Sequence, residues 1–190
     1  EIYATYKNSV HGKALMEEDN PDVPTCVDCH RAHDIEDPRT ASFRVTTPEL
    51  CDRCHGDRGI MEKYGLSPDV VKTYLQDFHG VSVAFYRQQG GQTRPAMAVC
   101  TDCHGVHDIQ KTEDPEARVI KANLVNTCRQ CHPDATENFP TAWLSHYEVS
   151  LQNTPPVFLV RAFYWLLIPF MMVGLGLHIA LDLWRLVFRR

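Results

Sequence analysis

A five-residue pattern that occurs four times constrains this chain of 190 residues more than any other feature. All eight cysteines stand in Cys-x-x-Cys pairs, and a histidine directly follows each pair. The chain holds only ten histidines, so the chance that a histidine follows all four pairs at random is roughly ten in a million. The five-residue unit Cys-x-x-Cys-His is therefore the motif to interpret, rather than the cysteine pairs alone. The cysteines are Cys26, Cys29, Cys51, Cys54, Cys100, Cys103, Cys128 and Cys131, and the histidines that follow them are His30, His55, His104 and His132.

Cys-x-x-Cys-His is the attachment sequence of c-type haem. Its two thiols lie about one helical turn apart, and each can add to a vinyl group on one edge of the porphyrin. The adjacent histidine then lies under the ring, where its imidazole can bind the iron. The sequence therefore predicts four covalent c haems, with the four motif histidines as their proximal ligands.

Three other uses of paired cysteines fit this sequence less well. A zinc ribbon has its pairs about 15–20 residues apart and does not need the fixed histidine, whereas 21 residues separate Cys29 from Cys51 and 24 separate Cys103 from Cys128. A disulfide framework also leaves the histidines unexplained. A redox pair of the thioredoxin type occurs once in a domain rather than four times.

The motifs belong to an internal repeat. Residues 25–35 align with residues 99–109, and seven of the eleven positions are identical. A His-Gly dipeptide precedes each copy, at His11 and at His79, and a second Cys-x-x-Cys-His motif follows each copy. The sequence therefore predicts a tandem duplication of a two-haem unit.

The repeat also indicates distal ligands for the iron. Four haems need four more ligands, and each unit supplies a His-Gly histidine and a histidine three residues after its first motif. His146 is a fifth candidate that has no counterpart in the repeat; it can replace one of the four or bind a haem of another subunit. The four expected distal ligands are His11, His33, His79 and His107.

Composition divides the chain near residue 150. Ile, Leu, Val and Phe account for 28 residues in 1–150 and for 19 residues in 151–190. The first share, about 19%, is at the level where a chain without cofactors has difficulty in forming a core. Residues 1–150 carry 15 Lys and Arg against 23 Asp and Glu, and this negative charge argues against nucleic acid as a partner.

We expect a mainly α fold with extensive loops, built as a multihaem cytochrome c fold. Its parts are a first dihaem unit at residues 1–66, a second at 67–150, a linker at 151–161 and a transmembrane helix with a basic end at 162–190.

Two helices can be predicted locally. Ser67 and Pro68 are typical of a helix start, and an apolar stripe from Val70 to Phe78 would place His79 on the same face as Leu75. A similar stripe precedes His11. Residues 17–25 and 34–48 lack a sustained period and are predicted as loops.

The C-terminal segment has the composition of a membrane span. Residues 162–181 hold no formal charge over 20 positions, about the length that crosses a bilayer. Arg161 precedes the span, and Arg185, Arg189 and Arg190 follow it. The positive-inside tendency therefore predicts a single pass through the cytoplasmic membrane, with the C-terminus in the cytoplasm and the haem part on the periplasmic side.

His178 lies inside this predicted span. An ionisable residue in a membrane helix is a functional candidate by default, and Gly174 and Gly176 would let a partner helix or a flat ring approach closely. His178 is therefore a candidate ligand to a b-type haem shared with a membrane partner, or a group near a quinone. The alternative is a hydrogen-bonded histidine at a helix interface.

The chain resembles the membrane-associated multihaem c-type cytochromes of bacterial respiratory or photosynthetic electron-transfer complexes. The resemblance rests on residues 10–12, on residues 26–35 with their copy at 100–109, and on the second motifs at Cys51 and Cys128. It implies a cofactor-filled fold and electron transfer as the activity.

The run Trp143 to Tyr147, the pair Phe163-Tyr164 and residues 178–182 resemble the junction where such cytochromes meet a membrane cytochrome b of the formate dehydrogenase gamma-subunit kind. One departure matters. The quinol dehydrogenases of the NapC/NrfH family carry their anchor at the N-terminus, whereas here it is C-terminal, so their quinol-site residues cannot be transferred.

Three functional classes remain from the sequence. An electron carrier between the membrane (the quinone pool or a cytochrome b or other quinone-reactive subunit) and an extracytoplasmic redox protein fits best, because two histidines per iron leave no open position for a substrate. A multihaem reductase or oxidase of small nitrogen or sulfur compounds would need a five-coordinate iron. A structural or assembly subunit is the third class.

Overall fold

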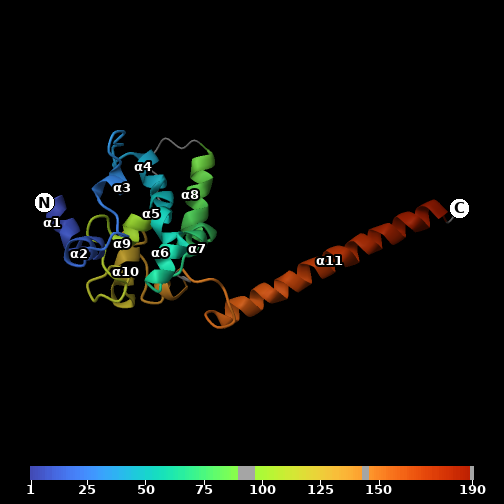
Figure 1. Ribbon diagram of the computed structural model, residues 1–190. Helices are drawn as coiled ribbons and strands as arrows, with labels where there is room; N and C mark the ends of the chain where they lie inside the picture. Colours follow the sequence, from blue (N-terminus) through green and yellow to red (C-terminus); the bar gives the residue numbers. More distant parts are fainter. Residues whose placement is uncertain (90–96, 143–145, 189–190) are drawn as a thin grey trace. The chain divides into compact units, whose positions relative to one another are not determined.

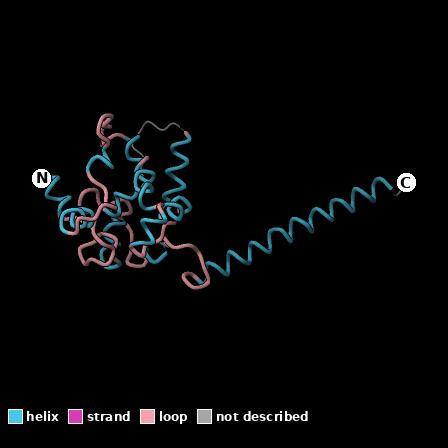
Figure 2. The backbone as a smooth tube through the Cα atoms, viewed as in Figure 1, coloured by secondary structure: helices cyan, strands magenta, loops and turns pink. Residues whose placement is uncertain are grey.

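The computed structural model describes residues 1–89, 97–142 and 146–188, and in these ranges the chain is helical without strands (Figures 1 and 2). The predicted mainly α fold with long loops is thus confirmed. Most helices have fewer than ten residues. They are α1 (Ile2–Lys7), α2 (Val10–Glu17), α3 (Cys26–His30), α4 (Ala41–Val45), α5 (Thr47–His55), α6 (Arg58–Lys63), α7 (Val70–Gln76), α8 (Phe78–Gln88), α9 (Cys100–His104), α10 (Lys121–Arg129), the 3-10 helix η1 (Phe139–Ala142) and α11 (Pro155–Phe188).

The chain forms two compact parts, residues 1–146 and residues 147–190. The first part contains the four Cys-x-x-Cys-His motifs, all of the predicted first unit and residues 67–146 of the predicted second unit. Its aliphatic core is small: Val45, Val83 and Val99 form a buried cluster, with Tyr86 and Met97 packed against it. Such a cluster is far smaller than a part of this length needs by itself, as the composition indicates.

Each His-Gly dipeptide lies in the first turn of a helix that follows a sharp break. Ser9 Oγ accepts a hydrogen bond from Gly12 N at 3.1 Å and so caps α2. Asp77 Oδ1 accepts bonds from His79 N and Gly80 N at 2.8 and 3.0 Å and caps α8 in the same way. The prediction of one helical face from Leu75 to His79 is therefore wrong, because the chain breaks at Asp77.

Both breaks bring the glycine against the preceding helix. A Cβ atom added to Gly12 would lie 2.0 Å from Tyr6 O, and one added to Gly80 would lie 2.1 Å from Tyr74 O. Only glycine allows this approach of two backbones. The structure thus explains why each of the two histidines is followed by glycine.

The loop prediction for residues 34–48 is partly wrong. Thr40 Oγ1 accepts a bond from Phe43 N at 3.2 Å and caps the short helix α4. Pro48 occupies the first turn of α5, where its missing N–H has no cost. Residues 18–25 lie outside helices, as expected.

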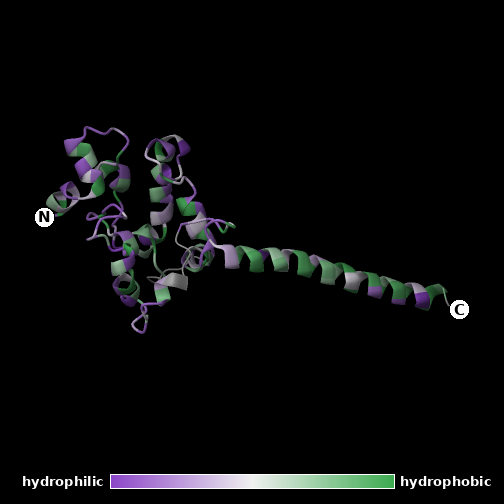
Figure 3. Ribbon diagram, turned by 90° about the horizontal axis from the view of Figure 1, so that it is seen from below, coloured by the Kyte–Doolittle hydropathy of each residue, from purple (hydrophilic) through white to green (hydrophobic). Residues whose placement is uncertain are grey.

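Helix α11 is long and apolar enough to cross a membrane, with a mean hydropathy of 2.0 and none of that window buried. Hydrophobic colour covers most of it (Figure 3). The helix begins at Pro155, so the greater part of the expected linker at 151–161 is helical. Proline suits the first turn of a helix, which explains the early start.

Candidate haem sites

The described histidine rings of the first compact part lie largely in pairs. Each motif histidine faces one histidine from outside the motifs, with the ring centres 6.0–6.4 Å apart. The pairs are His55 with His11 at 6.2 Å, His30 with His107 at 6.0 Å, His132 with His79 at 6.4 Å and His104 with His146 at 6.2 Å.

This separation fits one iron between two imidazoles. A metal binds an imidazole nitrogen at about 2.0 Å, and the ring centre lies about 1.1 Å behind that nitrogen, so two opposed imidazoles on one metal have centres about 6.2 Å apart. Rings without a metal lie at 5.1 Å in His132 and Phe139 and at 6.0 Å in His30 and Phe43, so the indication of iron comes from the recurrence of two histidines at this distance. The four pairs thus have the spacing of bis-histidine iron sites.

The helix that carries each first motif is capped from within. Asp28 Oδ2 accepts bonds from Thr25 N and Thr25 Oγ1, both at 2.6 Å, at the start of α3. Asp102 Oδ2 accepts a bond from Val99 N at 2.7 Å at the start of α9. Valine has no side-chain acceptor, so α9 has only half of the capping box. The acidic residue inside each Cys-x-Asp-Cys-His therefore fixes the helical turn that spaces the thiols.

Burial keeps several of the paired imidazoles neutral. It lowers the pKa of His11 to about 4, with a smaller contribution from His55. It also lowers the pKa of His104 to about 4, with contributions from His146 and His55. A neutral imidazole has a free lone pair, which is the form that binds a metal.

The cysteines are free and lie at or near the surface; Cys26 and Cys131 are exposed and the other six partly buried. Burial, followed by nearby acidic groups, raises the pKa of Cys103 to about 11, so it is a poor thiolate of the kind that zinc or thiol exchange needs. Among the described residues, no group of three His, Cys, Asp or Glu side chains gathers as a zinc site would require.

The four motifs form a contiguous series. Arg53 Nη1 of α5 donates to Asp28 O of α3 at 3.4 Å. Helix α5 packs against α9, and the thiols of Cys51 and Cys100 are hydrogen-bonded to each other. Helix α9 in turn packs against α10. Attachment sites for successive haems therefore adjoin one another through the first part.

The two repeat units are joined by a shared site. His30 belongs to the first unit and His107 to the second, yet their rings form one pair. Val10 N donates to Ile109 O at 2.8 Å. This bond holds the segment after His107 against the start of α2. A shallow, open cavity of about 700 Å³ lies beside His107 and is lined also by Ile2 and Tyr3 of α1.

A second bridge between the units is polar. Arg44 donates from Nη1 to Asp102 Oδ1 and from Nη2 to Met97 O, both at 2.7 Å. Its side chain is 16% exposed. The bridge ties α4 of the first unit to the haem-motif helix α9 of the second.

His33 and His146 differ from the simplest reading of the repeat. Within the part of the chain that the structure describes, His33 is exposed and stands outside the four ring pairs, whereas His146 faces His104. Each repeat also has a tyrosine five residues before its His-Gly histidine, which the sequence reasoning missed. Tyr74 Oη donates to Ala98 O at 2.9 Å, and Tyr6 Oη donates to Pro24 O.

These tyrosines lie on α1 and α7, the helices that precede the two His-Gly helices, and each connects its helix to the residue two positions before the first cysteine of its unit. The signal was present in the alignment, because Tyr6 and Tyr74 have the same offset as His11 and His79. His178 lies on α11 and is exposed, as are most residues of that helix. Residues 143–145, part of the predicted junction, and the terminal Arg189 and Arg190 lie outside the described residues.

A comparison with known families finds a match in the first part of the chain. Residues 17–59 match the doubled CXXCH motif family, a segment that contains the first two motifs. Neither a curated protein nor a solved structure matches the chain. The matched segment has the doubled CXXCH arrangement found in multihaem c-type cytochromes, and these motifs imply covalent haem c. The chain also carries one long apolar C-terminal helix.

Proposed function

We propose that the chain binds four covalent c haems, each between the two histidines of one ring pair. The spacing of the pairs supports this assignment, since all four have room for one iron and differ by only 0.4 Å. Each motif histidine then has one distal partner. The partner is His107 for His30, His11 for His55, His146 for His104 and His79 for His132. His33 is not a ligand in any of these four proposed haem sites.

We further propose that the protein is an electron conduit. When bound, each haem supplies a one-electron couple. The chain holds every iron between two imidazoles, which leaves no site for a substrate, and the contiguous series α3, α5, α9 and α10 keeps neighbouring attachment sites together. The single observation that carries the proposal is the set of four histidine pairs.

The C-terminal helix would anchor the conduit beside the membrane. The basic end after the span favours a cytoplasmic C-terminus and a periplasmic haem part. Electrons would pass between an extracytoplasmic redox protein and either the quinone pool or an integral-membrane cytochrome b. His178 is a candidate ligand to a b haem shared with that membrane subunit, and the small Gly174 lies one turn before it.

Reactivity tests the conduit against the enzyme alternative. The purified protein is reduced without oxygen, excess reductant is removed, and nitrite, hydroxylamine or thiosulfate is added. A conduit is not reoxidised by these compounds but is reoxidised by a one-electron protein acceptor. Reoxidation by one of the small compounds would contradict the proposal and favour a reductase, and reduction of the oxidised protein by hydroxylamine or thiosulfate would favour an oxidase.

The His178 proposal has its own test. The membrane complex that contains the chain should give a b-type pyridine haemochrome in addition to the c-type signal, and His178→Ala should remove it. A b-type signal that survives this substitution would exclude His178 as its ligand.

A further inference from the structure

Two of the four histidine pairs follow one rule of assembly. The first motif of the first unit, His30, is paired with His107, and the first motif of the second unit, His104, is paired with His146. In both cases the partner comes from a later segment of the chain. In the other two pairs, by contrast, the partner comes from an earlier segment than the motif histidine.

The two later segments also contact equivalent places. His107 lines a cavity with Ile2 at the start of α1. His146 is hydrogen-bonded to the backbone of Val70, at the start of α7. Ile2 and Val70 are both nine residues before the His-Gly histidine of their unit. His146 therefore lies beside Val70, and His107 lies near Ile2, the residue that corresponds to Val70 in the first unit.

His33 is the counterpart of His107 by alignment, but it has no such place here. His33 is exposed, and Ile35 is 68% exposed. Its equivalent Ile109 is partly buried, with its carbonyl bonded to Val10 N. The segment His33–Ile35 thus has the sequence of a ligand-donating segment and lies open at the surface.

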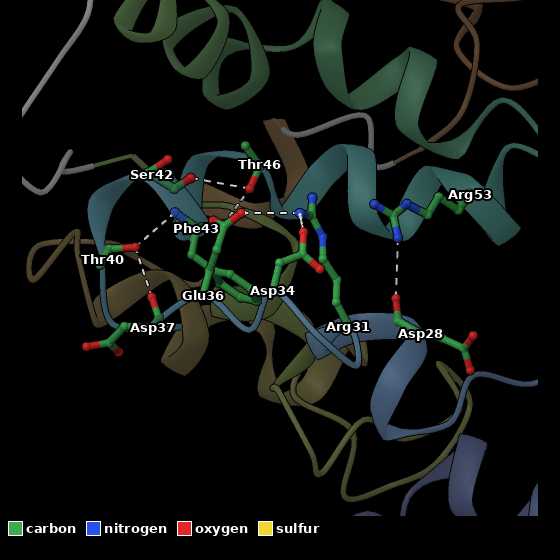
Figure 4. A network of polar contacts seen from close by, with 10 residues as sticks. All are labelled: Asp28, Arg31, Asp34, Glu36, Asp37, Thr40, Ser42, Phe43, Thr46 and Arg53. Atoms are coloured by element: carbon green, nitrogen blue, oxygen red, sulfur yellow. Dashed lines mark hydrogen bonds and ion pairs between the residues drawn. The ribbon is translucent and has the colours of Figure 1, made fainter.

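The loop around His33 is held in a defined shape. Arg31 has φ 63° and ψ 173°, a region that is nearly restricted to glycine, and the equivalent residue of the second unit is Gly105 with φ 85°. Arg31 Nη1 lies 2.7 Å from Asp34 Oδ2 and 3.6 Å from Glu36 Oε1, and the three side chains point toward one another (Figure 4). The exposed histidine is therefore presented on an ordered turn.

We propose that His33 is a distal ligand for the iron of a c-type haem carried by the extracytoplasmic redox partner. The inference rests on the proposed function. One coordinate bond forms from an imidazole nitrogen to an iron whose sixth position holds water, and the water leaves. A second copy of this chain is disfavoured as the donor of that iron, since the motif histidines already have ring partners.

Ligation by His33 would also connect two haems through the same spacing of histidines that connects two proposed haem sites within the chain. Two residues separate His104, of one haem site, from His107, of the next. The same spacing separates His30 from His33. His33 would connect the partner's haem to the site at His30 by the same short stretch of chain.

The test uses the full chain with its haems in detergent and, as the probe, a haem peptide with one Cys-x-x-Cys-His motif and an open sixth position. The protein's own spin state is recorded first, because high-spin haem there would mean that the proposed function fails, independently of His33. The peptide is then titrated, and the conversion of its high-spin signal to low-spin is followed by electron paramagnetic resonance.

The wild-type chain should convert the peptide at one equivalent, and His33→Ala should weaken this binding at least tenfold. The matched control is His33→Ala combined with Arg39→His, which restores an imidazole on the same loop at the wrong position; Arg39 has an 88% exposed side chain. The control should bind as weakly as His33→Ala. Binding by either variant equal to wild type, or no conversion by the wild type, would overturn the proposal.

Discussion

The ring centres of His104 and His146 lie 6.2 Å apart with their planes 22° from parallel. This pair joins a haem motif to a histidine that the internal repeat does not contain. It follows that the fourth distal ligand is expected from outside the repeat.

His146→Ala should therefore leave one of the four haems five-coordinate or water-ligated, because no other described histidine faces His104. We expect about a quarter of the low-spin signal to convert to high-spin in resonance Raman or electron paramagnetic resonance spectra. His33→Ala is the control and should leave the spectrum of the isolated protein unchanged. If a high-spin haem appeared in His33→Ala and not in His146→Ala, His33 rather than His146 would be the fourth distal ligand.

Gly80→Ala should prevent correct folding around the second unit. The added Cβ would lie 2.1 Å from Tyr74 O and 2.6 Å from Leu75 Cα, both backbone atoms that cannot turn aside. We expect a loss of about 3 kcal/mol or more in the free energy of unfolding, measured by chemical denaturation. In Gly59→Ala the nearest atom is an Asp57 carboxylate oxygen at 3.2 Å, and this control should be nearly neutral.

Tyr74→Phe should cost about 1 kcal/mol in the free energy of unfolding, because it removes the bond from Tyr74 Oη to Ala98 O. Burial raises the pKa of Tyr74 above its ordinary value of 10.0. The hydroxyl stays protonated in the folded state while it ionises in the unfolded state, so the stability advantage of wild type is constant below pH 10 and declines as the pH rises further. An advantage that instead grows above pH 10 would contradict this reading.

Arg31→Gly should raise thermal stability. Glycine adopts the backbone conformation of Arg31 without strain, and that strain is of the order of 1–3 kcal/mol, whereas the lost ion pairs of an exposed side chain are worth little. The melting temperature measured by circular dichroism should increase by several degrees. Arg39→Gly, on the same loop, should not increase it.

The sequence predicted more of the chemistry than of the local geometry. The attachment cysteines and proximal histidines followed from spacing, because a porphyrin demands two thiols and an imidazole at fixed positions. The repeat also singled out His11, His79 and His107, and each of them faces a motif histidine in the structure.

What could not be predicted depends on contacts between distant segments. The break at Asp77 depends on one capping carboxylate that overrides an apolar stripe. The pairing of His104 with His146 depends on the position of His146 beside Val70 of α7, and no periodicity in the sequence encodes that contact.

The most direct test of the electron-conduit account is an electron paramagnetic resonance spectrum of the fully oxidised, full-length protein, with haem quantified in the same sample. The account predicts four c haems per chain and ferric signals that are low-spin only, because every iron lies between two imidazoles. A substantial high-spin ferric signal that changes on addition of nitrite or hydroxylamine would contradict it, since this would reveal an iron open to substrate.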